Sequence, residues 1–316
     1  MSRPRLVCLV GPTASGKTEL ALALAECVGG EIVSADSRQV YRGLDVGTAK
    51  PTRAERAHVR HHCLDLADPD DRFDVARFRA AAGAAIADAH GRGRPVVVAG
   101  GTGLWVRALL GGLCAAPPAS PALRAALAGD GERDGSPALH ARLAAVDPIA
   151  AARIAPHDRV RVLRALEVAL ATGRPLSAWQ AEHRFADAPY DALVVGLAWP
   201  VDALAARIRA RAEAMVADGF VDEAARLARR GFGPEAPAMR AVGYREMLAC
   251  ARGTLSLEAA TDATVLATRR FAKRQRTWFR ARPEVVWRDP VGDRAAVLAE
   301  ASAFLAGVPA GDALGA

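Results

Sequence analysis

The sequence predicts an α/β protein with a P-loop NTPase-like parallel sheet, flanking helices and an all-helical insertion. Residues 6–18, LVCLVGPTASGKT, combine an unbroken apolar strand, a glycine loop and the start of a helix. Apolar runs at 31–36 and 96–99 predict further strands. A helical pattern without strand candidates fills 115–188, and a strand reappears at 192–199. Because that last strand must pair with the sheet already built, we expect the helical segment to be an insertion.

The first loop has the spacing of a phosphate-binding loop. Four residues separate Gly11 from the Gly16-Lys17-Thr18 triplet. Amides at the start of a helix favour an anion, Lys17 adds positive charge, and the Thr18 hydroxyl can ligate Mg²⁺. A chance tight turn is the alternative interpretation. We expect a phosphate or diphosphate, on a compound that the loop does not identify, to be bound by Gly11, Pro12, Thr13, Ala14, Ser15, Gly16, Lys17 and Thr18.

Two further loops are expected at the same sheet edge. The strand at 31–36 ends in Asp36, and the carboxyl ends of parallel strands face the ligand crevice. Asp36 can act there as a general base or hold Mg²⁺ through water, although a capping or turn carboxylate is also possible. After the strand at 96–99, a Gly-Gly-Thr-Gly turn allows close approach of a ligand, and Thr102 is its only hydroxyl.

The segment between these loops predicts a turn, a short strand and a helix. Residues 47–51 are expected to form a turn, and residues 63–67, CLDLA, a short strand. The adjacent His61 and His62 would point to opposite faces of a strand, so we expect no shared metal there. An amphipathic helix is expected over 73–93, with its phenylalanines on the inner side.

The composition changes at residues 115–121, APPASP and its neighbour, which predict a hinge-like linker. Helices are expected over 123–184, with breaks at 129–137, Pro148 and Pro175, and the chain after the strand at 192–199 is expected to be mostly helical. We therefore expect a catalytic core of residues 1–114 plus 189–306, a helical insertion of 115–188 and a disordered tail of 307–316.

Residues 268–282 form a basic stretch with seven basic residues and no acid, interleaved with aromatic residues. Its cations Arg269, Lys273, Arg276 and Arg280 fall at helical spacing on one face. A solvated basic helix with its aromatics turned inward is one interpretation. The absence of acids favours nucleic-acid binding instead.

The overall composition limits the class of protein. The 316 residues are 51% hydrophobic and carry a net charge of +7, which is weak evidence for a polyanionic partner. No apolar run approaches the roughly 20 residues that span a membrane, and the first residues lead directly into a strand without room for a signal peptide. Five scattered cysteines without metal-ligand spacing favour a reducing, cytoplasmic location. Only Lys17, Lys50 and Lys273 are lysines, which hints at sites needing a compact charge.

Several of these stretches together resemble the bacterial-type tRNA dimethylallyltransferases, also called tRNA isopentenyltransferases. They span nearly the whole chain: GPTASGKT at 11–18, SADSRQVYRGLDVGTAKP at 34–51, HHCLDL at 61–66, AGGTGLW at 99–105, RALEV at 164–168, RAVGYRE at 240–246 and FAKRQRTWFR at 271–280. Trp105 stands where the family pattern has Tyr, and Val242 where it has Ile. No zinc-finger extension like that of the eukaryotic relatives is present in the sequence.

The resemblance implies transfer of a dimethylallyl group from dimethylallyl diphosphate to the exocyclic amine of the adenosine immediately 3′ of the tRNA anticodon, with Mg²⁺. It implies that Asp36 is the general base, that Thr102 lies near the reacting centre, and that Arg211 and Lys17 neutralise the diphosphate. The insertion would grip the anticodon stem, and a monomer is expected. Residues expected to contact tRNA are Asp36, Ser37, Arg38, Gln39, Arg124, Val160, Arg161, Val162, Leu163, Arg164, Arg240, Ala241, Val242, Gly243, Tyr244, Arg245, Lys273 and Arg276.

Two other classes of function fit parts of the sequence. A P-loop kinase of a small metabolite would share the phosphate loop, Asp36 and the sheet, but it has little use for the basic stretch at 268–282. A tRNA-binding module with a vestigial phosphate loop would use the basic stretch without chemistry. The substrate that becomes labelled distinguishes these classes from the transferase.

Overall fold

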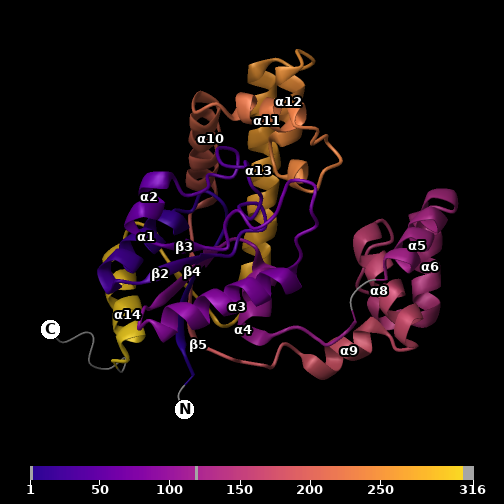
Figure 1. Ribbon diagram of the computed structural model, residues 1–316, viewed down its shortest axis with the longest axis horizontal. Coiled ribbons are helices and arrows are strands. Elements are labelled where there is room, and N and C mark those ends of the chain that lie inside the picture. Colours follow the sequence, from indigo (N-terminus) through magenta and orange to yellow (C-terminus); the bar gives the residue numbers. More distant parts are fainter. Residues whose placement is uncertain (1–2, 118–119, 309–316) are drawn as a thin grey trace. The chain divides into compact units, whose positions relative to one another are not determined.

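The computed structural model describes residues 3–117 and 120–308. Within these residues, six strands form one parallel sheet flanked by helices (Figure 1). The strands are ordered β3-β2-β4-β1-β5-β6, so the predicted α/β class is confirmed. Their bounds are β1 Arg5–Val10, β2 Glu31–Ser34, β3 His61–His62, β4 Val96–Gly100, β5 Asp191–Leu197 and β6 Val285–Arg288.

The described chain divides into two compact units, one of residues 1–110 and 189–316 and one of residues 111–188. The first unit contains the sheet and most helices: α1 Lys17–Val28, α2 Arg53–His58, α3 Val75–Gly91, α4 Gly103–Gly111, α10 Val201–Ala217, α11 Phe220–Arg229, the 3₁₀ turn η1 Ala238–Arg240, α12 Tyr244–Ala251, α13 Leu257–Arg280 and α14 Arg294–Ala306. Helix α4 ends at the boundary between the units.

Strand β1 is buried on both faces, as expected for a central strand of a parallel sheet. Leu6, Cys8 and Val10 pack into the same core as residues of α3 and α4. Val7 and Leu9 alternate with them and pack toward α1 and α14. This double burial fixes the register, so the carboxyl ends of β1, β2 and β4 meet at one edge of the sheet.

The described residues of the second unit form five helices with a separate core. They are α5 Pro121–Arg133, α6 Ser136–Val146, α7 Pro148–Ala151, α8 Arg159–Thr172 and α9 Leu176–His183. Leucines and alanines dominate the core, including Leu139 and Leu143. The fully buried Asp147 accepts hydrogen bonds from the backbone N–H groups of Ala150 (2.9 Å) and Ser177 (2.9 Å), which ties α7 to α9.

The prediction of a short strand at residues 63–67 is wrong, because the strand β3 consists of the preceding residues, His61–His62. Cys63 and Asp65 adopt positive φ angles of 62° and 55°, which end the extended backbone. Lys50 contacts the Asp65 carboxylate at 2.6 Å. A tertiary ion pair, which local pattern does not encode, therefore helps set the conformation here.

The helix break expected at residues 129–137 also needs correction. The break expected from Gly129 begins later, because α5 continues to Arg133. A Cβ on the buried Gly131 would lie 2.7 Å from Leu139 Cδ1, so this glycine permits close helix packing rather than ending the helix. The described chain after β5 is mostly helical, as expected, and the short strand β6 extends the sheet beside β5.

The C-terminal helix α14 ends at Ala306, and Gly307 caps it with a φ of 86°. Of the tail expected at 307–316, residues 309–316 lie outside the described residues, as do 118–119 of the expected linker. Across residues 3–117 and 120–308, no helix combines the length and apolar character needed to cross a membrane.

Candidate active site

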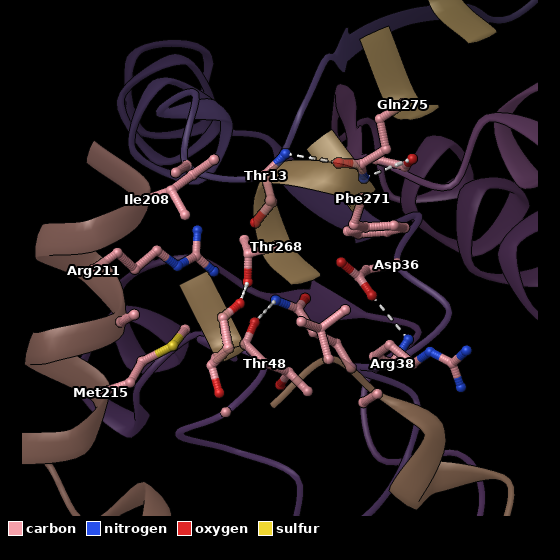
Figure 2. Close-up of a pocket in the computed structure, with 18 of the residues that line it drawn as sticks. Thr13, Asp36, Arg38, Thr48, Ile208, Arg211, Met215, Thr268, Phe271 and Gln275 are labelled. Atoms are coloured by element: carbon pink, nitrogen blue, oxygen red, sulfur yellow. Dashed lines mark hydrogen bonds between the residues drawn. The ribbon is translucent and has the colours of Figure 1, made fainter. Parts of the chain in front are cut away.

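A chamber of about 250 Å³ lies at the carboxyl edge of the sheet in the first unit (Figure 2). The phosphate loop and the loops after β2 and β4 form one part of its wall, and α10 and α13 form another. Figure 2 shows Arg211 and Met215 projecting from α10, with Asp36 and Phe271 on the opposite side. The structure thus brings Lys17, Thr18, Asp36 and Arg211 to one chamber.

The phosphate loop enters α1 through a left-handed backbone conformation at Gly16. Gly16 occupies the position before the helix with a φ of 89°, which only glycine adopts without strain. Lys17 Nζ donates to the Pro12 carbonyl oxygen at 2.6 Å. Desolvation, reinforced by Arg211 and opposed by Asp36, lowers the pKa of Lys17 to about 7. Lys17 is therefore strongly responsive to an arriving anion.

Three side chains from distant parts of the chain support this loop. Gln275 of α13 accepts from the Thr13 N–H (2.9 Å) and donates to the Gly101 carbonyl oxygen (2.9 Å). Arg207 Nε donates to the Ala14 carbonyl oxygen at 2.9 Å, and its guanidinium lies 4.5 Å from the Trp199 ring centroid. Helices α10 and α13 therefore fix the loop from two sides.

Asp36 lies two residues after the end of β2 and lines the chamber. Its Oδ1 accepts from the Arg38 N–H at 2.8 Å, so the turn role considered for this carboxylate is real. The turn also aims Asp36 toward the cations, because its charge acts on Lys17, Arg38 and Arg211. A structural and a chemical role are compatible in this side chain.

Thr102 is positioned beside the Asp36 loop. Its Oγ1 accepts from the Ser37 N–H at 3.0 Å, which joins the loops after β2 and β4. Arg38 donates to the Pro237 carbonyl oxygen at 3.1 Å, and desolvation lowers the pKa of its guanidinium. The polar loops on this side of the chamber are therefore linked into one network.

Arg211 faces the chamber as a second uncompensated cation. Burial is the main cause that lowers its pKa, Asp36 opposes it, and Arg207 adds repulsion. In the part of the chain that the structure describes, no carboxylate lies within ion-pair distance of Lys17 or Arg211. Lys17 and Arg211 thus give the chamber the positive charge that a phosphate or diphosphate needs.

The face of α13 that lines the chamber differs from the expected basic face. Thr264, Thr268, Phe271 and Gln275 recur at helical spacing on the chamber side, with the exposed Arg274 at its rim. Lys273 and Arg276 line a different groove with Arg269, beside α10. The chamber face was missed from sequence, although the apolar and polar stripe at i, i+4, i+7 and i+11 was the available signal.

Residues 240–245 have divided roles. Arg240, Ala241 and Val242 line the chamber, and Arg245 is exposed. Tyr244 is fully buried and donates its hydroxyl to Glu223 at 2.7 Å. The side chain of Tyr244 therefore belongs to the interior of the first unit, in contrast to the exposed Arg245.

Glu223 also holds the loop that follows Asp36. Its buried carboxylate accepts from the N–H groups of Asp45 (2.9 Å), Val46 (2.8 Å) and Gly47 (3.0 Å). The same loop ends in Lys50, whose ammonium contacts Asp45 at 2.8 Å as well as Asp65. Lys50 is thus a buried structural cation, whereas the sequence only hinted at a special role.

Gln39 lies in the chamber wall and holds the loop that contains Thr48 and Ala49. Its amide donates to the carbonyl oxygens of Thr48 (3.2 Å) and Ala49 (3.1 Å), and its own oxygen accepts from Ser34 Oγ (2.8 Å). Gln39 lines the chamber but is largely buried. Its side chain is a structural bridge between β2 and the loop that carries Thr48.

In the second unit, Arg124 and Arg164 converge on the buried Glu167. Arg124 Nη2 lies 2.8 Å from Glu167 Oε2, and Arg164 Nη1 lies 3.9 Å from the same oxygen. Val160 and Arg161 are exposed on the same helix. Val162 and Leu163 instead pack in or against the core of this unit.

Comparison with known proteins identifies the family. A family model described as "IPP transferase" matches residues 39–282, and a model described as "Isopentenyl transferase" matches residues 4–68. This chain belongs to the IPP transferase family. The family predicted from the motifs is therefore confirmed.

Relatives in this family match over most of their length. The chain is 51% identical over 286 residues to the tRNA dimethylallyltransferase of Geobacter sulfurreducens, covering 90% of this chain and 92% of the relative. It is 56% identical over 289 residues to that of Anaeromyxobacter dehalogenans strain 2CP-C, covering 92% and 96%.

Solved structures share the fold. The tRNA isopentenylpyrophosphate transferase of Bacillus halodurans matches with a TM-score of 0.70 and 39% identity, over 96% of each chain. A eukaryotic dimethylallyltransferase acting on tRNA matches with a TM-score of 0.83 over 97% of this chain and 80% of that chain, at 24% identity. The latter likeness shows the fold alone.

Trp105, which departs from the family pattern, is a core residue. It is 4% exposed and stacks on Phe78 with ring centroids 4.3 Å apart. Phe73 packs on it at 5.8 Å. The larger indole is accommodated by this aromatic cluster and does not line the chamber.

Proposed function

We infer that this chain transfers a dimethylallyl group from dimethylallyl diphosphate to the exocyclic amine of the adenosine immediately 3′ of a tRNA anticodon. One observation supports the chemistry most directly. Two cations without ion-pair partners in the described chain, Lys17 and Arg211, share a small chamber with Asp36. Such a site favours departure of a diphosphate next to a base.

The reaction breaks one bond and forms another. The allylic C–O bond breaks, and its electron pair leaves with the diphosphate. The adenine nitrogen forms the new C–N bond, and Asp36 takes the proton that this nitrogen loses. Lys17 and Arg211 stabilise the charge that grows on the diphosphate as the bond breaks. A positioned base of this kind contributes about 10²–10⁴-fold to the rate.

Thr102 and the loop of Asp36 orient the base relative to the donor. Thr102 Oγ1 accepts the Ser37 N–H at 3.0 Å, and this contact holds the two loops that would flank the adenine. The adenosine must leave the anticodon-loop stack to reach the chamber, which costs a few kcal/mol. Single-stranded loop bases are the usual targets of such recognition.

Mg²⁺ fits the mouth of the phosphate loop. Mg²⁺ is commonly held by one or two protein oxygens together with substrate phosphates. Thr18 offers an exposed hydroxyl in the first turn of α1, beside Lys17 and at the chamber wall. Thr18 would therefore hold Mg²⁺ with the diphosphate oxygens, and the ion would supply further charge neutralisation.

The tRNA would be held by both units. In the first unit, the exposed or chamber-lining Arg38, Arg240 and Arg245 together with Lys273 and Arg276 supply positive charge for phosphates. In the second unit, the anticodon stem would bind to the surface that carries Arg124, Arg161 and Arg164.

A single chain supplies all of the residues that this function needs, so a monomer suffices. The free cysteines fit a reducing cytoplasm.

The decisive experiment measures which of two labelled substrates transfers its label to tRNA. The protein is incubated with unmodified tRNA and Mg²⁺, with either labelled dimethylallyl diphosphate or γ-labelled ATP. We expect label to enter tRNA from the prenyl donor alone, with equimolar release of diphosphate. Digestion of the tRNA and mass spectrometry of the nucleosides then locates the modified adenosine.

The alternatives give different results. Transfer of the γ-phosphate to a small metabolite would indicate a P-loop kinase and contradict the proposal. Binding of tRNA without release of diphosphate would indicate a binding module.

A further inference from the structure

Helix α10 forms one long wall of the chamber, starting at the phosphate loop. Arg207 contacts the loop at Ala14, and Ile208, Arg211 and Met215 follow on the chamber side. Because a helix rises 1.5 Å per residue, this wall reaches about 12 Å from the loop. The side chains on this wall change from the charged guanidinium of Arg211 to the flexible, apolar thioether of Met215 farther from the loop.

Helix α13 forms a second wall and runs in the opposite direction. Gln275 binds the phosphate loop, and Phe271, Thr268 and Thr264 follow away from it. Threonine hydroxyls on this wall are turned to the helix backbone, since Thr264 Oγ1 donates to the Ala260 carbonyl oxygen at 2.8 Å. Thr264 therefore presents its methyl group outward. Both walls thus become apolar away from the phosphates.

Phe220 closes the chamber at the apolar end. It is the first residue of α11, directly after the Gly219 turn that ends the α10 wall, and it is 1% exposed. A Cβ on Gly47 would lie 2.1 Å from the Phe220 ring, and one on Gly243 would lie 2.8 Å from it. The Tyr244 ring packs edge-on at 4.9 Å. Phe220 therefore has no room to rotate away.

We propose that Phe220 limits the prenyl donor to a single five-carbon unit by closing the chamber beyond Met215 and Thr264. This inference rests on the proposed function and adds the determinant of donor length. With the diphosphate at Lys17 and Arg211, the prenyl tail points along the apolar walls and ends against the phenyl ring. A geranyl tail, which is one isoprene unit longer, collides with that ring.

The rigidity of the closure matters as much as its position. Met215 also lines the chamber, but its side chain is flexible and can repack. Phe220 is packed between two glycines, and Tyr244 behind it is anchored on Glu223 at 2.7 Å. A flexible side chain in this position would repack around a longer prenyl tail, whereas the packed ring of Phe220 cannot move aside.

The test compares two donors in matched variants. Dimethylallyl diphosphate and geranyl diphosphate are each incubated with unmodified tRNA, and kcat/KM is measured from the prenylated nucleoside. Wild type is expected to use geranyl diphosphate poorly. Phe220→Ala removes a ring about the size of one isoprene unit and is expected to raise the geranyl-to-dimethylallyl ratio by about 100-fold. Phe220→Leu, a milder change, is expected to raise it by about tenfold.

Phe279→Leu is the matched control. Phe279 is also buried, at 2% exposure, but it packs in the core rather than against the chamber. The control should leave the donor ratio at the wild-type value while losing similar stability. Thermal melts of all variants identify any that fail to fold, in which case the two leucine variants decide.

An unchanged ratio in folded Phe220→Leu would overturn the proposal, and so would efficient geranyl transfer by wild type. If wild type transfers neither group to tRNA, the proposed function itself fails. The two failures are therefore distinguishable.

Discussion

The two polar loops beside the chamber differ in whether their lysines have carboxylate partners. In the phosphate loop, Lys17 contacts only backbone and hydroxyl oxygens within the described residues, and Arg211 opposite has no carboxylate within ion-pair distance. In the loop at 45–50, Lys50 contacts both Asp45 and Asp65, and Glu223 occupies the backbone amides. A cation that is paired with carboxylates of the protein, such as Lys50, has a structural role. A cation without such a partner in the described residues, such as Lys17, is available to bind a ligand.

The largest effect is expected at the carboxylate that faces the unpaired cations. Asp36→Asn should lower single-turnover transfer by about 10²–10⁴-fold, because the adenine amine loses its base. Binding of tRNA, measured by filter retention, should persist. Asp68→Asn is the matched control, since Asp68 forms an exposed ion pair with Arg42 outside the chamber. Near-normal transfer by Asp36→Asn would remove Asp36 as the base.

Replacing the unpaired lysine should affect chemistry more than folding. Lys17→Met is expected to lower kcat by about 10²–10³-fold, because a preorganised group that stabilises developing charge is lost. Denaturant titration should show little loss of unfolding free energy. A large loss of stability instead would place Lys17 with the structural charges.

Replacing the paired lysine should do the reverse. Lys50→Met removes the ammonium that contacts Asp45 and Asp65 and is expected to lower the free energy of unfolding by about 2 kcal/mol, since Asp65 keeps its ion pair with Arg56. The folded fraction should keep kcat within a few-fold of wild type. The same denaturant titration and turnover assay, run beside Lys17→Met, would expose the contrast, and a mainly catalytic defect would contradict it.

The pKa of Lys17 predicts a pH dependence. Because this pKa is lowered to about 7, the ammonium is present below that pH and is lost above it. In the free enzyme, kcat/KM for the prenyl donor should fall up to tenfold per unit above about pH 7. Lys17→Arg keeps its charge there and should give a flat profile. A wild-type profile that is flat to pH 9 would show that the charge of Lys17 is dispensable.

The smallest effect is expected on the outer face of α13. Arg276→Ala should weaken tRNA binding a few-fold and reduce the slope of log affinity against log salt by about one. Arg270→Ala tests a neighbour in the same groove. A salt slope equal to that of wild type would show that Arg276 does not contact tRNA phosphates.

The parts of the fold predicted well are those with strong local signals. The phosphate loop has fixed spacing, and the central strands are unbroken apolar runs, so β1, β4 and the lone β5 were all located. Strand β3 has two residues, which is too short for a periodic signal, and β6 was also not predicted. The backbone at Cys63 and Asp65 depends on a tertiary contact with Lys50, which no local pattern contains.

The site was predicted unevenly for similar reasons. Asp36 and Thr102 follow strands directly, so the topology itself carries Asp36 to the chamber wall and Thr102 to the loop beside Ser37. Gln275 and Phe220 lie on helices, and which face of a helix lines the chamber depends on tertiary packing. The basic residues of α13 predicted a functional role for its other face. Val162, expected at the RNA, is buried in the core of its unit, because motif matching does not distinguish the faces of a helix.

The strand order has a consequence for synthesis on the ribosome. Strand β1 pairs with β4 on one side and β5 on the other, but the second unit is encoded between them. At about 5–20 residues per second, roughly 5–20 s pass between completion of β4 and of β5. During that interval the nascent sheet exposes a hydrophobic edge of β1, which invites pairing with other chains. The helices of the second unit, which have a hydrophobic core of their own, emerge in that same interval.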